Sequence, residues 1–313
     1  MWSYIARKLL YNIPVYLGII LFLMLALRVN DPAYAFLGKS ASAEDLLDIR
    51  AKLGLDQPFF SQYMRVLSFD FEVESWANEG LTVSEMLSSS VIPSLSITLP
   101  ALMLTSIISI SIALLSAFFR GRPVDRTLMV LAVIGMSISF LVFIIFGQYW
   151  GAYVLTREYG LDLFAVSGYE SGISNWAYYC LLPVLISTIV AVGYDTRFYR
   201  AVMVEESGRD YITTAKAKGA SKRKVMFVHM LKNAMIPIIT RIMTTLPFLI
   251  MGSLLLEMYF NIPGMGRVLL KAIQEQDFPV IQSFVTILAG VFILSNILTD
   301  VLYALVDPRV RLS

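Results

Sequence analysis

The stretch TTAKAKGASKRKV, residues 213–225, gathers five basic side chains around one glycine in the middle of a strongly apolar chain. Alanine and lysine favour a helix on both sides of this glycine. Gly219 suits the left-handed residue that ends a helix, and Ser221 suits the first cap of the next one. No acidic residue lies between Tyr211 and Pro237. The stretch therefore predicts a basic helix, a tight turn at Gly219 and a second basic helix.

The composition of the whole chain indicates an integral membrane protein. Of its 313 residues, 57% are hydrophobic and 15% are charged, whereas a soluble domain usually has about 25% charged residues. The 4 Trp, 16 Tyr and 19 Phe fit the aromatic side chains that collect at membrane interfaces. The single cysteine, Cys180, excludes an internal disulfide.

Six apolar windows are long enough to cross a bilayer, because a spanning helix needs about 20 mostly apolar residues. They are residues 9–28, 95–119, 127–150, 178–199, 234–256 and 283–305. The first window follows two basic residues as a signal peptide does, but it lacks a small-residue cleavage site, so we interpret it as a retained span. We expect an all-α membrane protein in which residues 1–313 form a single transmembrane domain.

The distribution of charge orients these spans. An even number of spans puts both termini on one side, and the cytoplasmic side carries the excess of Lys and Arg. With the termini inside, the inner segments hold 16 of the 25 basic residues, and the outer segments hold 16 of the 23 acidic residues. We expect both termini and the loop 200–236 to be cytoplasmic. Residues 29–94 are then an extracytoplasmic segment with two or three short helices.

The motifs of several chemistries are absent from the sequence. It contains no G-x-x-x-x-G-K-[ST], and therefore no P-loop for a nucleotide. It contains no C-x-x-C or H-E-x-x-H, and its one histidine, His229, falls on the predicted cytoplasmic side. A metal site, a Ser-His catalytic pair and a nucleic-acid partner are not expected. The sequence favours a transport or scaffold role over an enzyme.

Polar side chains inside spans are candidates for a pathway or gate, because they are costly to expose to lipid. These candidates are Gln148, Asp195, Arg197, Arg241, Asn296 and Asp300. Asp195, Arg197 and Arg241 lie near the predicted inner ends of their spans, so anchoring at the membrane surface is an alternative for them. Asn296 and Asp300 are four residues apart and share one helix face.

The basic loop has two interpretations on physical grounds. Basic helices often lie on anionic lipid of the inner leaflet. Alternatively, the small side chains of alanine and glycine allow a partner protein to approach closely. In the second helix, 3.6-residue periodicity places Phe227, Leu231, Ala234 and Met235 near one face.

A wider view of the loop shows a resemblance to a known family. The stretch 197–237 resembles the coupling (EAA) loop of the membrane subunits of type I ABC importers, especially the first permease subunit of the peptide/nickel/opine group. The matching residues are Arg197, Arg200, Glu205, Gly208, Asp210, Tyr211, Thr214, Ala215, Ala217, Lys218, Gly219, His229, Leu231, Asn233, Ala234 and Pro237. The resemblance extends over the chain, including EMYFNIPGMGRVLLKAI (257–273), DFPVIQ (277–282) and DVLYALVDPRVRL (300–312).

The resemblance implies the type I importer fold, transport by alternating access and a place in the bacterial cytoplasmic (inner) membrane. It implies ATPase coupling through Glu205, Asp210, Tyr211, Thr214, Ala215, Ala217, Lys218 and Gly219, with Ser221 and Lys222 beside them. The implied partners are a second homologous permease, two ABC ATPases that bind ATP and Mg, and an extracytoplasmic solute-binding protein. No cofactor is expected in this chain itself.

The chain departs from the family pattern in places that bear on its cargo. The third span of the family usually contains S-I-P-S-F-W, where this chain has Ser137-Ile138-Ser139-Phe140-Leu141-Val142. Ser137, Ser139 and Phe140 therefore join the pathway candidates. Di- and oligopeptides are the expected cargo, with nickel chelates, opines or another small solute as alternatives. A stand-alone carrier or channel is the alternative from a different class, although such carriers usually have more spans or repeat halves.

Overall fold

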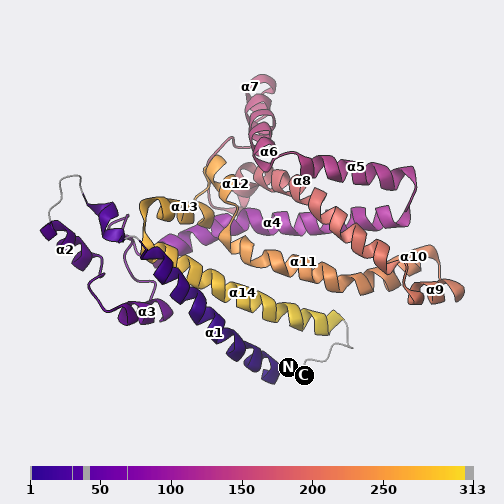
Figure 1. Cartoon of the computed structure of the whole chain (residues 1–313). Helices are drawn as coiled ribbons and strands as arrows, with labels where there is room; N and C mark the ends of the chain where they lie inside the picture. The colour runs from indigo at the N-terminus through magenta and orange to yellow at the C-terminus, as the bar shows by residue number, and fades with distance from the viewer. Residues whose placement is uncertain (1, 30, 38–42, 69, 307–313) are drawn as a thin grey trace. The chain divides into compact units, whose positions relative to one another are not determined.

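The computed structural model describes residues 2–29, 31–37, 43–68 and 70–306. Within these ranges the chain is almost entirely helical, and its β pairing is one isolated bridge between Glu74 and Thr82 (Figure 1). Six helical stretches among these residues are long and apolar enough to span a membrane: Ala6–Leu27, Val83–Phe118, Phe140–Tyr159, Ile173–Glu206, Lys222–Tyr259 and Phe278–Leu305. The prediction of an all-α protein with six spans is confirmed.

The chain divides into two compact units, and the first comprises Met1–Ile92 and Pro263–Ile297. Its elements are α1 (Trp2–Leu27), the 3-10 helix η1 (Pro32–Phe36), α2 (Ala43–Lys52), α3 (Phe59–Leu67), the start of α4 (Val83–Phe118), α13 (Met265–Glu275) and most of α14 (Phe278–Val306). Figure 1 shows α1 beside α14, where the Tyr16 hydroxyl donates to the carbonyl of Thr286 at 3.5 Å. Three short helices, η1, α2 and α3, lie between the first two spans, which agrees with the two or three short helices expected within residues 29–94; the extracytoplasmic location of this segment stays a prediction.

The second unit comprises Pro93–Ile262 and Leu298–Ser313. Besides the rest of α4 and α14, it contains α5 (Pro123–Ser137), α6 (Phe140–Phe146), the π-helix η2 (Gly147–Val154), α7 (Leu155–Tyr159), α8 (Ile173–Glu206), α9 (Asp210–Ala217), α10 (Lys222–Lys224), the π-helix η3 (Val225–Met230), α11 (Leu231–Met251) and α12 (Leu254–Tyr259). Two apolar clusters form its core, one around Ile144 and Leu256 and one around Tyr199 and Ile238.

A buried aspartate organises the first unit. Asp277, 1% exposed, lies between α13 and α14 and accepts hydrogen bonds from the Ser75 hydroxyl at 2.5 Å and from the backbone N–H groups of Trp76 (3.2 Å) and Ala77 (3.4 Å). The Trp76 ring stacks on Phe278, with centroids 5.5 Å apart. The carboxylate therefore fixes the chain before α4 against the start of α14, because each of its oxygens is satisfied by donors from that segment.

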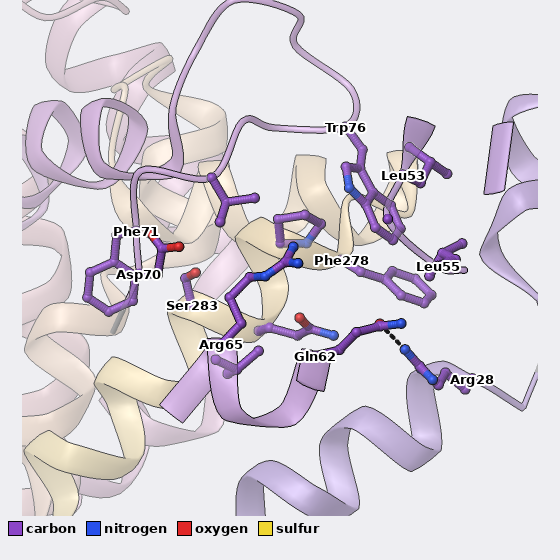
Figure 2. Close-up of a pocket in the computed structure, with 15 residues that line it drawn as sticks. Arg28, Leu53, Leu55, Gln62, Arg65, Asp70, Phe71, Trp76, Phe278 and Ser283 are labelled. Carbon is purple, nitrogen blue, oxygen red and sulfur yellow. Dashed lines mark hydrogen bonds between the residues drawn. The ribbon is translucent and has the colours of Figure 1, made fainter. Parts of the chain in front are cut away.

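A small cavity of about 70 Å³ lies next to this contact. Figure 2 shows Trp76 and Phe278 along one side of it, Arg65 near its centre, and Arg28 hydrogen-bonded to Gln62. The guanidinium of Arg28 also lies 4.9 Å from the centroid of the Phe59 ring. The cavity is far smaller than the 300–1,000 Å³ or so that is usual for sites of small organic ligands. We therefore infer that the side chains lining this cavity pack the segment before α4 and do not form a ligand site.

Replacing Asp277 with alanine should loosen residues 75–83 without unfolding the chain. Three donors would lose their acceptor, which costs about 1–3 kcal/mol for a buried group. Hydrogen exchange of the amides in this segment should accelerate roughly tenfold, while the amides of α8 keep their protection. Asp70→Ala is the matched control, because Asp70 is exposed. Equal exchange in the two variants would contradict the anchoring role of Asp277.

The third span differs from its prediction. A continuous helix over 127–150 was expected, but α5 ends at Ser137, and Ile138 and Ser139 are extended with ψ of 134° and 139°. Figure 1 shows the chain turning sharply there, so that α6, η2 and α7 project away from α5. The candidate span that follows is Phe140–Tyr159. The prediction placed this span too early along the chain.

Contacts with α8 explain why the break after Ser137 is tolerated. A helix would pair the carbonyl of Met136 with a later N–H; here the Tyr194 hydroxyl donates to it at 3.1 Å. Gly193 lets α8 approach closely, because a Cβ at this position would come within 2.8 Å of the carbonyl oxygen of Ala132. A neighbouring helix thus satisfies the backbone that the break exposes, as a span requires.

Candidate functional site

The segment that follows α8 is an exposed, polar turn. Glu205 and Arg209 form an exposed ion pair at 2.8 Å, which contributes little to stability. Tyr211 is half-buried and donates to Glu206 at 2.5 Å. Burial, together with this hydrogen bond, raises the pKa of Tyr211 above its usual value. Tyr211 is therefore held as a neutral donor that fastens α9 to the end of α8.

Helix α9 packs one face on the second unit and exposes the other. Ile212 and Ala215 are buried in the cluster around Tyr199 and Ile238. The remaining predicted coupling residues of this region are exposed: Glu205, Asp210, Thr214, Ala217, Lys218, Gly219, Ser221 and Lys222. Ala215 packs its methyl group against the protein's own core, so it does not offer its surface to a partner, and its role in ATPase coupling stays a prediction. Ala217 and Gly219 remain accessible to a partner.

The turn predicted at Gly219 is confirmed. Gly219 has φ of +79°, in the region that favours glycine. Its N–H donates to the carbonyl of Lys216 at 2.9 Å, and the N–H of Ala220 donates to Ala215 at 3.1 Å. The Ser221 side chain then caps the next helix by accepting from the N–H of Lys224 at 3.3 Å. Local capping chemistry thus sets the direction of the chain between α9 and α10.

The second helix of the loop has a different buried face from the predicted one. Its residues in the cluster around Tyr199 and Ile238 are Val225, Met230, Ala234 and Ile238 itself, whereas Phe227 is 54% exposed. The reason is η3, because a π-helical turn has i→i+5 hydrogen bonds and shifts all later side chains around the axis. The spacing of five residues between Val225 and Met230 reflects this turn. The 3.6-residue periodicity assumed from the sequence was therefore wrong for Phe227.

Two side chains connect this segment to the turn between α4 and α5. The Lys222 ammonium donates to the carbonyl of Phe118 at 2.7 Å and lies 4.0 Å from the centroid of the Phe118 ring. A cation at the C-terminus of α4 is also favoured by the helix dipole. Arg120 donates to the Ser207 hydroxyl at 3.4 Å. Lys222, predicted to contact a partner, thus has a contact within the chain.

A buried ion pair adds a third connection that the sequence did not reveal. Asp125, 3% exposed, accepts from Arg200 Nε and Nη2, both at 2.8 Å, and from the N–H of Gly121 at 3.0 Å. The Ser116 hydroxyl also donates to it. The hydrogen bonds from Arg200 hold the pKa of Asp125 well below its usual range. This network ties α4, α5 and α8 together where α8 leads into the loop.

A cavity of about 660 Å³ lies among α4, the break between α5 and α6, α8, α11 and α12. Five of the predicted pathway residues line it: Ser137, Ser139, Phe140, Asp195 and Arg241. The volume is within the range of small-molecule sites. In the part of the chain that the structure describes, Asp195 and Arg241 are the charged residues among its lining, which is otherwise apolar or hydroxyl-bearing.

Asp195 and Arg241 form an ion pair inside this cavity. Nε and Nη2 of Arg241 both lie 3.0 Å from a single oxygen, Oδ1 of Asp195. The side chain of Asp195 is 10% exposed and that of Arg241 is 42% exposed. Asp195 of α8 thus binds one edge of the guanidinium, while much of the Arg241 side chain stays exposed. The alternative that these residues anchor the chain at the membrane surface does not account for their place in the cavity lining.

The other four pathway candidates do not line this cavity. Gln148 donates to the backbone carbonyls of Val166 at 3.0 Å and Tyr259 at 2.9 Å, which is a structural role. Arg197 and Asn296 are exposed, and Asp300 is half-buried. In the described ranges, no three His, Cys, Asp or Glu side chains are grouped so that they could hold a metal ion.

In the ranges that the structure describes, the chain has six spans, a cavity among them, and two short helices joined by a turn where the fourth span leads into the fifth. These features are those of a multi-span membrane transport component. The chain belongs to the family described as binding-protein-dependent transport system inner membrane component, which matches residues 109–312. The N-terminal part of the same kind of component matches residues 1–91. The chain is therefore a permease subunit of a binding-protein-dependent ABC transporter and a multi-pass inner-membrane protein.

Relatives match the chain over nearly its full length. It is 34% identical to a protein of Sinorhizobium fredii named "Probable peptide ABC transporter permease protein y4tP", over 99% of this chain and 100% of the relative. It is 35% identical to the glutathione transport system permease protein GsiC of Salmonella paratyphi A and 32% identical to GsiC of Escherichia coli (strain K12), in both cases over 99% of each chain.

Proposed function

We propose that this chain is the permease subunit of an ATP-driven importer of short peptides, including peptide-like molecules such as glutathione. It pairs with a second, similar permease. The pair binds two ATPase subunits, which hold ATP and Mg, at the side where both termini lie, the cytoplasm. Substrate arrives from an extracytoplasmic binding protein. The names of the relatives at 32–35% identity support the peptide cargo.

One observation carries the coupling part of this proposal. The exposed segment from Glu205 to Lys222 is attached to the helices that line the cavity of about 660 Å³. Helix α8 leads into the segment and α11 follows it, while Lys222 contacts the end of α4 and Arg200 binds Asp125 of α5. A force applied to α9 therefore reaches α8 and α11 along the chain, and α4 and α5 through the contacts of Lys222 and Arg200.

The mechanism that follows is alternating access by rigid-body movement. ATP closes the ATPase dimer, and the groove that holds α9 moves with it. Because Ile212 and Ala215 are buried in the second unit, α9 cannot move alone. The helices α4, α5, α8 and α11 follow, and the cavity changes the side to which it opens. This chain contributes no covalent chemistry, and ATP hydrolysis takes place in the partner subunits.

Purification of the tagged chain from its native membrane tests this proposal. We expect a P-loop ATPase and a second permease to co-purify in fixed ratio, and proteoliposomes of this complex to take up peptide only with internal ATP and external binding protein. Uptake by the isolated chain without ATP would instead support a stand-alone carrier. Uptake of a nickel chelate or an opine in place of peptides would correct the cargo and leave the coupling intact.

A further inference from the structure

The guanidinium of Arg241 has one edge committed and one edge open. Nε of Arg241 donates to one of the two carboxylate oxygens of Asp195, Oδ1, and Nη2 forms an ion pair with the same oxygen. This contact occupies the edge of the guanidinium that carries Nε. Among the described residues, no side chain is hydrogen-bonded to Nη1 of Arg241. A structural pair of minimum exposure would use both carboxylate oxygens in a fork and bury both partners. This pair does neither, since Arg241 keeps 42% of its side chain exposed.

The rest of the cavity lining complements a peptide. The hydroxyls of Ser137, Ser187 and Thr245 donate to carbonyls of their own helices, Val133 (2.7 Å), Val184 (3.0 Å) and Ile242 (2.7 Å). Each oxygen is therefore left as an acceptor, which suits amide N–H groups. The apolar lining, including Phe140 and Phe248, suits side chains. Among the described residues that line the cavity, Arg241 supplies the one cationic group, so it is the side chain that can form an ion pair with an anion.

We propose that the open edge of Arg241 binds the terminal carboxylate of the transported peptide, while Asp195 positions the guanidinium. This inference rests on the proposed peptide import and adds the chemical group that the cavity recognises. A guanidinium presents Nη1 and the second hydrogen of Nη2 as a planar fork that matches a carboxylate. Asp195 stays bound on the other edge, so no ion pair has to be broken when the peptide arrives. Its negative charge also weakens the hold on the substrate carboxylate, which permits release.

The test compares two peptides that differ only in this group. The complete transporter, reconstituted with its ATPases and binding protein, is given labelled trialanine with a free carboxylate or with a C-terminal amide. The measured quantity is the ratio of the uptake efficiencies for the two peptides. Any preference of the binding protein multiplies this ratio equally for every permease variant, so it cancels when variants are compared with the unaltered complex.

Arg241→Gln should lower the carboxylate-to-amide ratio about tenfold or more, because it removes a charge-assisted hydrogen bond. Asp195→Asn should preserve or raise the ratio and slow release, since the guanidinium then lacks its competing anion. Arg126→Gln removes an exposed arginine of α5 that does not line the cavity and should leave the ratio unchanged. The double variant Asp195→Asn/Arg241→Gln avoids an unpaired buried carboxylate and should show the same loss of preference, even where Arg241→Gln alone folds poorly.

The outcomes separate this inference from the function on which it rests. If uptake of both peptides falls equally in Arg241→Gln and in the double variant, the carboxylate-to-amide ratio is unchanged and the ion pair is purely structural. That result would overturn the carboxylate inference but not the proposed peptide import. An unaltered complex that takes up neither peptide would overturn the proposed peptide import, and the inference with it. A lowered ratio in both variants and an unchanged one in Arg126→Gln would establish carboxylate recognition.

Discussion

Replacing Gly219 with valine should lower ATP-driven uptake by about 5- to 30-fold, although the substituted side chain has room. Apart from its two chain neighbours, no described residue has an atom within 4 Å of where a Cβ would lie, so the penalty comes from the backbone alone. At φ of +79° a residue other than glycine costs about 1–2 kcal/mol, and β-branched valine is among the worst fitted. Such an energy changes a population about 5- to 30-fold. The turn between α9 and α10 is the element that we propose the ATPase moves.

Two substitutions act as controls for this experiment. Gly219→Asn should retain most of the activity, because asparagine tolerates the left-handed conformation. Gly208→Ala changes a glycine of the same loop that lacks a positive φ and whose Cβ would lie 3.5 Å from the carbonyl of Glu205, an ordinary contact. ATPase stimulation by the loaded binding protein, measured beside uptake, reports coupling directly. Full uptake and stimulation in Gly219→Val would argue against a coupling role of this turn.

The parts of the structure that could be predicted are those controlled by nearby residues. Gly219 and Ser221 act within three residues of themselves, so their roles in the turn follow from capping chemistry alone. The number of spans follows from apolar segments that are long enough to cross a bilayer. The exposed face of α9 also agrees with its polar side chains, although the burial of Ala215 depends on the helices around it.

The parts that could not be predicted depend on distant partners or on irregular helix geometry. The break after Ser137 is stabilised by Tyr194 of α8 and lacks the proline that the family usually has there. The π-helical turn at η3 shifts the buried face by part of a turn, and periodicity analysis assumes that no such turn exists. Asp125 lies in a short basic segment that resembles an exposed loop, and its partner Arg200 is 75 residues away.

Replacing Asp125 with alanine should destabilise the second unit by about 3–5 kcal/mol, because it leaves Arg200 without its buried counter-ion. Ser116 and the N–H of Gly121 would lose the same acceptor. The unfolding midpoint of the purified complex in detergent should fall, and uptake should fall with it, since this network joins α4, α5 and α8 next to the coupling loop. Glu158→Ala removes an exposed acid of the same unit and should change stability by no more than about 0.5 kcal/mol.

Two further measurements separate the ion pair from simple packing. Asp125→Ala/Arg200→Met removes both charges and should recover part of the lost stability, since neither partner is then left unpaired. The pKa of Asp125 is depressed in the folded protein, so its contribution is complete above the ordinary value of 3.8 and is lost as the pH falls below it. The stability difference between the unaltered protein and Asp125→Asn should therefore narrow below about pH 4. A difference that stays constant down to pH 3 would mean that shape, and not charge, accounts for the role of Asp125.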